Sequence, residues 1–383
     1  MKPDTHFCLV SAQPLPNALP ALDPNLGARR VVLATTPDMT RRAEWLESVF
    51  RPRPVKVDHL PLDDAWNYDH VQTRVMEFLE EEKKAGRLDG IALNATGGTK
   101  LMSVAAYEAF RAYRLPVFYV HPVRDEVIWL QPCGLPPHRL ADRIRIEPFL
   151  ELHGARVAST PRRSVPRAEA LQLAENLVQA APKYTRAIGR LNYLTSQLRS
   201  PGLVIDLDDP DPELDSLIDQ FGAAGYLSRI DDRHIRFRDE ESVAFINGRW
   251  IEAWVFDQVR KIREHDPVIQ DVAYDINVER QQRGRPVPNE LDVVVLRNNR
   301  LHIIECKTRR FREQGAESAG AEALYKLDSL RDLMGGLQAR AMLVSYRDLP
   351  GHDRTRAADL GIAVCAGEQL RRLHQHLVEF FRD

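Results

Sequence analysis

Residues 289–308 read NELDVVVLRNNRLHIIECKT and carry the clearest structural signal in the chain. Two runs rich in β-branched residues flank Asn298 and Asn299. Consecutive asparagines tolerate the positive φ angles of a tight two-residue turn. The stretch therefore predicts an antiparallel β-hairpin in which Arg297 pairs with Arg300.

This register brings charged side chains together. It places Asp292 opposite Glu305 and Glu290 opposite Lys307, all on one face, because side chains alternate along a strand. Opposed Cβ atoms lie roughly 4.5–5.5 Å apart, so two carboxylates can share one cation. Oxygen ligands suit Mg²⁺ or Mn²⁺, which would polarise a phosphate and activate water. Lys307 would orient that water or stabilise the developing charge.

A further carboxylate comes from the preceding amphipathic segment WIEAWVFDQVRKI, residues 250–262. At 100° per residue, Ile251, Val255 and Val259 define an apolar arc. Glu252 falls inside this arc, where an acid needs a partner. We therefore expect Asp292, Glu305 and Glu252 to bind the metal, and these three with Lys307 to form the catalytic set.

The alternative is that these charges line a solvated hairpin face, since a D-x(12)-E-x-K spacing also arises by chance. The ELD and ECK segments, with the helix before them and ALYKLDSLRDLMGG and MLVSY after them, resemble the PD-(D/E)xK restriction-endonuclease-like fold. They resemble in particular the nuclease domain of CRISPR ancillary nucleases. The resemblance implies catalysis by Asp292, Glu305 and Lys307, with Glu252 recruited to the metal. Tyr325 and Lys326 either contact substrate or are ordinary residues of an amphipathic helix.

In the N-terminal part, short apolar strands alternate with amphipathic helices, beginning with HFCLVSA and RVVLATT. This alternation predicts right-handed βαβ units and a doubly wound parallel sheet. Ligands bind such sheets outside the carboxyl ends of the strands. Two polar loops are expected at that edge, namely SAQPLPN after the first strand and NATGGTK at residues 94–100.

The second loop opens a helix, and its adjacent glycines allow close approach to phosphate. It lacks the spacing of a Walker loop, and no G-x-G-x-x-G follows the first strand, so ATP hydrolysis and NAD binding are poorly supported. Glycine also serves turns for structural reasons alone, and Asn17 is a candidate helix cap. The candidate ligand-binding residues are Ser11, Gln13, Asn94, Thr96, Gly97, Gly98, Thr99 and Lys100.

These loops resemble those of the CARF domain (CRISPR-associated Rossmann fold) that precedes the nuclease domain in such proteins. The resemblance implies a homodimer that binds a cyclic oligoadenylate, usually cyclic tetra-adenylate, across its two-fold axis. It also implies a metal-dependent nuclease of type III CRISPR defence, acting on single-stranded DNA or RNA or nicking duplex DNA.

Three domains are expected in this α/β chain: a Rossmann-like CARF domain over residues 1–140, a helical segment over residues 141–244 and a restriction-endonuclease-like α/β domain over residues 245–383. In the middle segment, residues 150–200 look helical. The helix DSLIDQFGAAGYL and the hairpin LSRI-DD-RHIRF that follow it are typical of part of a winged helix.

The composition is that of an ordinary globular protein, with 44% hydrophobic and 28% charged residues among 383. A net charge of −2 means that a nuclease needs a local basic groove, such as the arginines near 280–312. The four cysteines are scattered without zinc-type spacing. The chain shows neither a secretory leader nor an apolar run of about 20 residues. We expect a cytoplasmic protein without a membrane contact.

Two other functions stay open. In the first, the N-terminal sensor drives a winged-helix DNA reader through residues 190–238, without catalysis. In the second, the N-terminal pocket itself degrades the cyclic oligoadenylate, as a ring nuclease. Sequence-specific duplex binding would identify the former, and metal-independent linear oligoadenylate products the latter.

Overall fold

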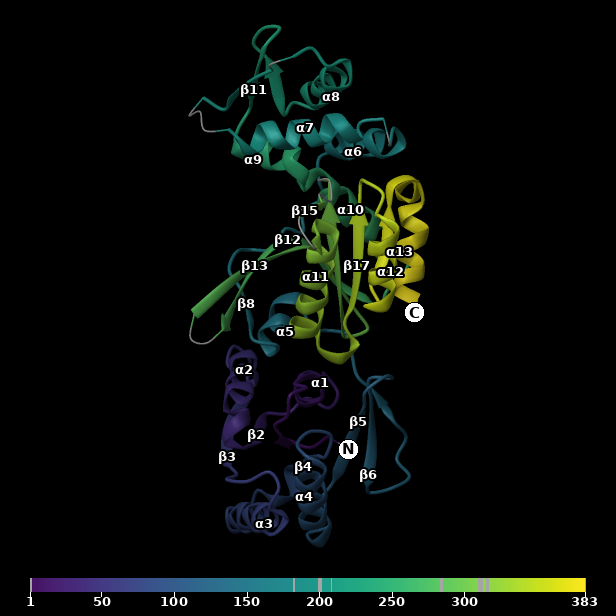
Figure 1. Ribbon diagram of the computed structural model, residues 1–383. Coiled ribbons are helices and arrows are strands. Elements are labelled where there is room, and N and C mark those ends of the chain that lie inside the picture. Colours follow the sequence, from purple (N-terminus) through teal and green to yellow (C-terminus); the bar gives the residue numbers. More distant parts are fainter. Residues whose placement is uncertain are drawn as a thin grey trace. The chain divides into compact units, whose positions relative to one another are not determined.

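The computed structural model describes residues 2–181, 183–198, 202–207, 209–282, 285–308, 313–314 and 317–382. The chain divides into two compact units, Met1–Arg156 and Val157–Asp383. The arginine-rich groove expected near 280–312 falls partly outside the described residues. Figure 1 shows the elements of each unit.

A seven-stranded sheet with the order β3-β2-β1-β4-β5-β6-β7 forms the centre of the first unit. Strands β1 to β5 pair in parallel, and β6 and β7 are added antiparallel. The strands are β1 Thr5–Leu9, β2 Arg30–Thr35, β3 Lys56–Pro61, β4 Ile91–Asn94, β5 Val117–His121, β6 Glu126–Gln131 and β7 His138–Arg139. The expected parallel sheet is confirmed, and the antiparallel edge is an addition that the helix–strand alternation did not predict.

The first unit also contains five α-helices, namely α1 Leu15–Leu22, α2 Thr40–Phe50, α3 Tyr68–Lys84, α4 Lys100–Ala112 and α5 Ile146–Leu152. Helices α3 and α4 bury their apolar faces with strand residues such as Phe7 and Leu93 in one core cluster. Asn67 caps α3, and its side chain accepts a hydrogen bond from the His70 N–H. Burial of these apolar stripes fixes the helices and so the loops that precede them.

The second unit contains a six-stranded sheet with the order β18-β17-β14-β13-β12-β8. Strands β12, β13 and β14 form an antiparallel meander, and β14, β17 and β18 run parallel. Figure 1 shows β12 and β13 continuing as a long ribbon. The strands are β8 Ala155–Val157, β12 Ile269–Gln282, β13 Arg285–Arg297, β14 Arg300–Lys307, β17 Arg340–Ser345 and β18 Ala363–Ala366. A short pair, β15 Glu313–Gln314 and β16 Glu317–Ser318, lies outside this sheet.

Helices pack around this second sheet and extend beyond one end of it (Figure 1). They are α6 Ala168–Gln179, α7 Thr185–Ser196, α8 Pro212–Ala223, α9 Glu240–Ala244, α10 Trp250–Arg263, α11 Ala319–Gly335, α12 Gly351–Asp359 and α13 Leu373–Arg382. A π-helical turn, Phe245–Arg249, joins α9 to α10, and Gly248 within it has a φ of 140°. This conformation favours glycine.

The middle of the chain packs against the second sheet rather than standing apart. One hydrophobic cluster runs from Ala170 in α6 to Phe381 in α13. The Tyr346 hydroxyl donates to the Leu177 carbonyl at 2.8 Å, and the Trp254 indole N–H donates to Glu175 at 3.0 Å. We therefore propose that the segment from residue 157 onward folds as part of the nuclease unit.

The structure tests several predictions about single elements. The hairpin after α8 is confirmed as β10 Leu227–Arg229 and β11 His234–Phe237, and β9 Val204–Asp206 adds a third strand. The helical prediction for residues 150–200 is wrong at Ala155–Val157, which pairs as the edge strand β8. Asn17 does not cap a helix, because it lies buried inside α1. No helix within the described ranges has the length and apolar character needed to cross a membrane.

Candidate active site and ligand-binding loops

The β13–β14 turn has the predicted geometry. Asn298 and Asn299 adopt φ angles of 51° and 54°. Arg297 pairs with Arg300, and the pairing continues to Val293 opposite Ile304. The predicted register is therefore confirmed from Arg297 and Arg300 to Val293 and Ile304. Continued by one further step, the same register would bring Asp292 across from Glu305.

Asp292 and Glu305 are both buried, at 6% and 3% exposure. The Cys306 N–H donates to Asp292 Oδ2 at 2.7 Å, which ties the Asp292 carboxylate to the next strand. Lys307, one alternation beyond Glu305, holds its ammonium group against the Glu305 carboxylate. The sequence order E-C-K thus presents an acid and an amine on one face, with Cys306 buried on the other.

Helix α10 supplies a third acid. Glu252 lies in its first turn, and Ile251, Ala253 and Val255 around it are all buried. Burial raises the pKa of the Glu252 carboxyl, and the nearby charges of Asp292 and Glu290 raise it further. The packing of α10 against the sheet therefore aims Glu252 at the same acidic group, as the helical periodicity predicted.

The charges of the acidic side chains at this site are not balanced. Burial and the charge of Glu305 raise the pKa of Asp292. Burial by itself would lower the pKa of Lys307, but the charges of Glu305 and Asp292 outweigh this and raise it. The Lys307 ammonium group alone cannot neutralise the ionised carboxylates of Glu252, Asp292 and Glu305, so a bound divalent cation would stabilise this arrangement.

The donor set fits a divalent cation. Glu252 Oε2 and Glu305 Oε2 are buried and have no hydrogen-bond partner within the described residues. Unpaired buried oxygens of this kind are costly, and carboxylates are the ligands that Mg²⁺ and Mn²⁺ prefer. Among the described residues no three His, Cys, Asp or Glu side chains already enclose a metal position. Binding would therefore require side-chain adjustment at Glu252 or Glu305.

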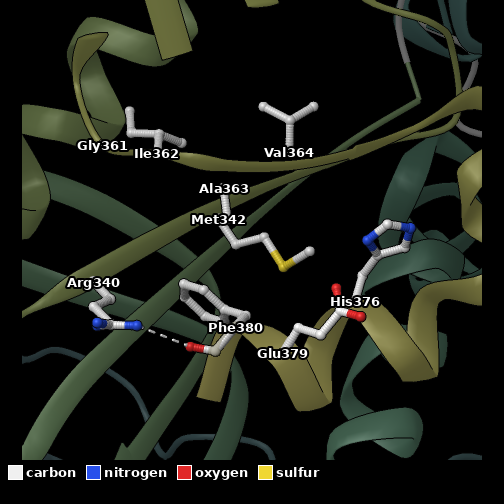
Figure 2. Close-up of a pocket in the computed structure, with 9 residues that line it drawn as sticks. All are labelled: Arg340, Met342, Gly361, Ile362, Ala363, Val364, His376, Glu379 and Phe380. Atoms are coloured by element: carbon white, nitrogen blue, oxygen red, sulfur yellow. Dashed lines mark hydrogen bonds between the residues drawn. The ribbon is translucent and has the colours of Figure 1, made fainter. Parts of the chain in front are cut away.

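The second unit also contains a cavity of about 480 Å³. Its lining residues come from strands β17 and β18, the turn before β18, and helix α13, and Figure 2 shows the Met342 side chain extending toward His376. Arg340 donates to the Phe380 carbonyl there. Its lining contains none of the four predicted catalytic residues, namely Glu252, Asp292, Glu305 and Lys307.

In the first unit, the two predicted loops meet at the carboxyl ends of adjacent strands. β1 pairs with both β2 and β4, so the strand order reverses there. Cys8 stands opposite Asn94 in this register. Such a switch point is where doubly wound sheets bind ligands.

Asn94 joins the two loops. It is fully buried, and its amide donates to the Pro16 carbonyl at 2.7 Å and to Asn17 Oδ1 at 3.2 Å. The side-chain oxygen Oδ1 of Asn94 accepts a hydrogen bond from the Thr96 hydroxyl at 2.7 Å. Thr99 caps α4 by accepting the Met102 N–H. We propose that Asn94, Thr96 and Thr99 support the loop.

The remaining predicted residues are more accessible. Lys100 is exposed, and Ser11, Gln13 and Gly98 are partly exposed. Gly98 has a φ of 71°, which turns the loop into the start of α4. These groups, with the free N–H groups of the helix start, are the ones that can meet a phosphate.

Gly97 is a position where the structure requires glycine. A Cβ there would lie 2.0 Å from the Leu9 carbonyl oxygen. We expect Gly97→Ala to separate the two loops and destabilise the first unit by about 1–3 kcal/mol. Thermal unfolding measures this, with Gly90→Ala as the control, because its Cβ meets nothing closer than 3.7 Å. Equal stability of the two variants would contradict the close packing of Gly97.

No sequence pattern indicates two further groups near the acidic cluster. Arg249 precedes α10, and its charge lowers the pKa of Glu252 against the effect of burial. Thr308 follows Lys307, and its hydroxyl accepts from the buried Asn192 of α7 at 3.1 Å. Neither belongs to a motif, because their place depends on the packing of distant segments.

Comparison with known proteins identifies both units. Residues 5–148 match the family described as the Card1 CARF domain, and residues 239–383 match the Card1-like endonuclease domain. Curated proteins give no match. The fold and the acidic site thus define an endonuclease with an N-terminal CARF domain.

Solved structures extend this similarity to nearly the whole chain. VC1899 from Vibrio cholerae is 34% identical with a TM-score of 0.85, over 99% of this chain and 98% of that one. Can2 from Sulfobacillus thermosulfidooxidans, in complex with cyclic tetra-adenylate, is 26% identical with a TM-score of 0.81, over 99% of both chains. A type III CRISPR defence DNA nuclease activated by cyclic oligoadenylate shares the fold at 20% identity and a TM-score of 0.60, over 99% of this chain and 52% of that one. The chain belongs to the Card1 family.

Proposed function

We propose that cyclic tetra-adenylate activates this endonuclease through its N-terminal unit, and that a divalent cation serves its active site. The similarity to Can2 carries the proposal, because that protein holds cyclic tetra-adenylate and resembles this chain over its full length. The two loops that meet at the β1–β4 switch point offer an exposed lysine and a helix start for its phosphates.

The chemistry follows from the chain's own groups. Asp292, Glu305 and Glu252 would hold Mg²⁺ or Mn²⁺, which supplies charge at the scissile phosphate when bound. Lys307, held by Glu305, remains protonated and can stabilise charge that develops during phosphodiester cleavage. The burial of this cluster strengthens each of these interactions.

The protein is proposed to act as a homodimer in the cytoplasm, as part of type III CRISPR defence. A symmetric cyclic ligand suits an isologous interface between two copies. The four cysteines are all free, three of them buried, which fits a reducing compartment. The substrate is single-stranded DNA or RNA, or duplex DNA that is nicked.

Activation is tested with the purified full-length chain, Mn²⁺ and labelled single-stranded DNA, single-stranded RNA and plasmid. Cleavage should require cyclic tetra-adenylate, and the ligand must favour the active form by differential contacts. No cleavage with any cyclic oligoadenylate would overturn the proposal. Duplex binding without cleavage would favour a regulator, and linear oligoadenylate products without metal would indicate a ring nuclease.

Lys100 offers a specific prediction about the activator. We expect Lys100→Ala to raise the cyclic tetra-adenylate concentration for half-maximal cleavage about 10- to 100-fold, because one charge-assisted hydrogen bond is lost. The maximal rate at saturating activator should stay near that of the wild type. Lys84→Ala, at another exposed lysine of the same unit, is the control. Unchanged activation in both variants would remove Lys100 from the ligand site.

A further inference from the structure

Asp275 has an unusual backbone conformation beside the acidic cluster. It lies in the middle of β12 with a φ of 54°, although Tyr274 and Ile276 on either side pair regularly with β13. In a regular strand its position would be across from Asp292. A non-glycine residue rarely adopts a positive φ inside a strand, so the surrounding structure must hold Asp275 there.

Two arginines form ion pairs with the Asp275 carboxylate. Asp275 is 7% exposed, and its Oδ2 lies 2.8 Å from Arg162 Nε and 3.2 Å from Arg249 Nε. Arg162 is itself fixed, because its backbone pairs with Tyr274 and its Nη1 donates to Glu241 at 2.7 Å. The Asp275 carboxylate therefore lies in an ion-pair cluster with Arg162 and Arg249 rather than in solvent.

Arg249 belongs to this cluster and also acts on the acidic site. It directly precedes α10, and its charge acts on Glu252 three residues later. Its side chain is 24% exposed. In the described part of the chain its guanidinium makes the Nε ion pair with Asp275 and no hydrogen bond. Its two terminal Nη groups thus keep donors for a further anion.

We infer that Arg249, positioned by Asp275, binds a phosphate of the nucleic-acid backbone next to the scissile bond. A guanidinium offers parallel N–H groups that match two phosphate oxygens. The ion pair through Nε holds the guanidinium near Asp275 and leaves both Nη groups of this fork available. The inference deepens the proposed function, on which it rests, and it concerns the phosphodiester chemistry that DNA and RNA share.

Oligonucleotide binding tests this inference apart from cleavage. Fluorescence anisotropy with labelled single-stranded DNA and RNA is measured in EDTA, with and without cyclic tetra-adenylate, at several salt concentrations. We expect Arg249→Ala to weaken binding about 10- to 100-fold. The slope of log affinity against log salt should fall by about 1. Arg249→Lys should keep the slope but recover the affinity only in part, because lysine has no fork.

Asp275→Asn tests the positioning role. Its expected effect is a lower affinity with the wild-type salt slope, since Arg249 keeps its charge but loses its anchor. Arg372→Ala, at an exposed arginine in Gly367–Arg372, should behave as the wild type. Wild-type affinity and slope in Arg249→Ala would overturn the inference. If the wild type binds no oligonucleotide with or without activator, the proposed function fails instead.

Discussion

Asp292→Asn should lower the single-turnover cleavage rate about 10²- to 10³-fold at saturating metal and activator, as expected for the loss of a key electrostatic group. The same substitution should leave the thermal stability of the metal-free protein at neutral pH unchanged or raise it. Asparagine keeps an oxygen that can accept the Cys306 N–H bond, while it removes a buried charge.

This pair of outcomes separates a catalytic acid from a structural one. Burial and Glu305 raise the pKa of Asp292, so its ionised form is disfavoured in the folded metal-free protein. A structural acid would instead lose stability when it is neutralised. Asp332→Asn, at an exposed residue of α11, is the matched control and should change neither property. Full cleavage by Asp292→Asn, or its unfolding several degrees below the wild type, would contradict the assignment.

Much of the fold follows from local patterns in the sequence. Helix–strand alternation predicts the parallel sheet, and the asparagine pair predicts the β13–β14 turn with its register. These signals are local, because periodicity and turn chemistry involve neighbouring residues. The strand Ala155–Val157 gives no such signal, since three residues are too few for periodicity and its partner β12 lies over 100 residues away.

In the candidate site too, local patterns predict some of the residues and not others. Asp292, Glu305 and Lys307 follow from one hairpin, and Glu252 follows from the apolar arc of one helix. Arg249 and Asp275 could not be found, because their meeting depends on a positive φ inside β12 and on the packing of α10. In the N-terminal loops the pattern shows which residues gather, but not that buried Asn94 serves the loop itself. That distinction depends on burial, which a single sequence does not reveal.

A divalent cation should stabilise the protein, and more strongly as the pH rises. Burial and neighbouring acids raise the pKa values of Glu252 and Asp292. Above about pH 4 the unfolded chain releases the protons of such groups while the folded chain retains them. The metal-free protein therefore loses stability as the pH rises from about 4 through the raised pKa values. A cation binds the ionised carboxylates, so its apparent affinity increases over this same range.

The measurement is the shift in unfolding temperature caused by Mg²⁺ or Mn²⁺ at pH 6 and pH 8, at constant ionic strength. A ligand at 100 times its dissociation constant stabilises by about 2.7 kcal/mol, which raises Tm by about 5–10 °C for a unit of this size. The double variant Glu252→Gln, Asp292→Asn should lose the shift at both pH values and show a flatter pH dependence without metal. If the double variant kept the wild-type shift, the cation would bind elsewhere, and the carboxylates of Asp292 and Glu252 would have no metal to hold.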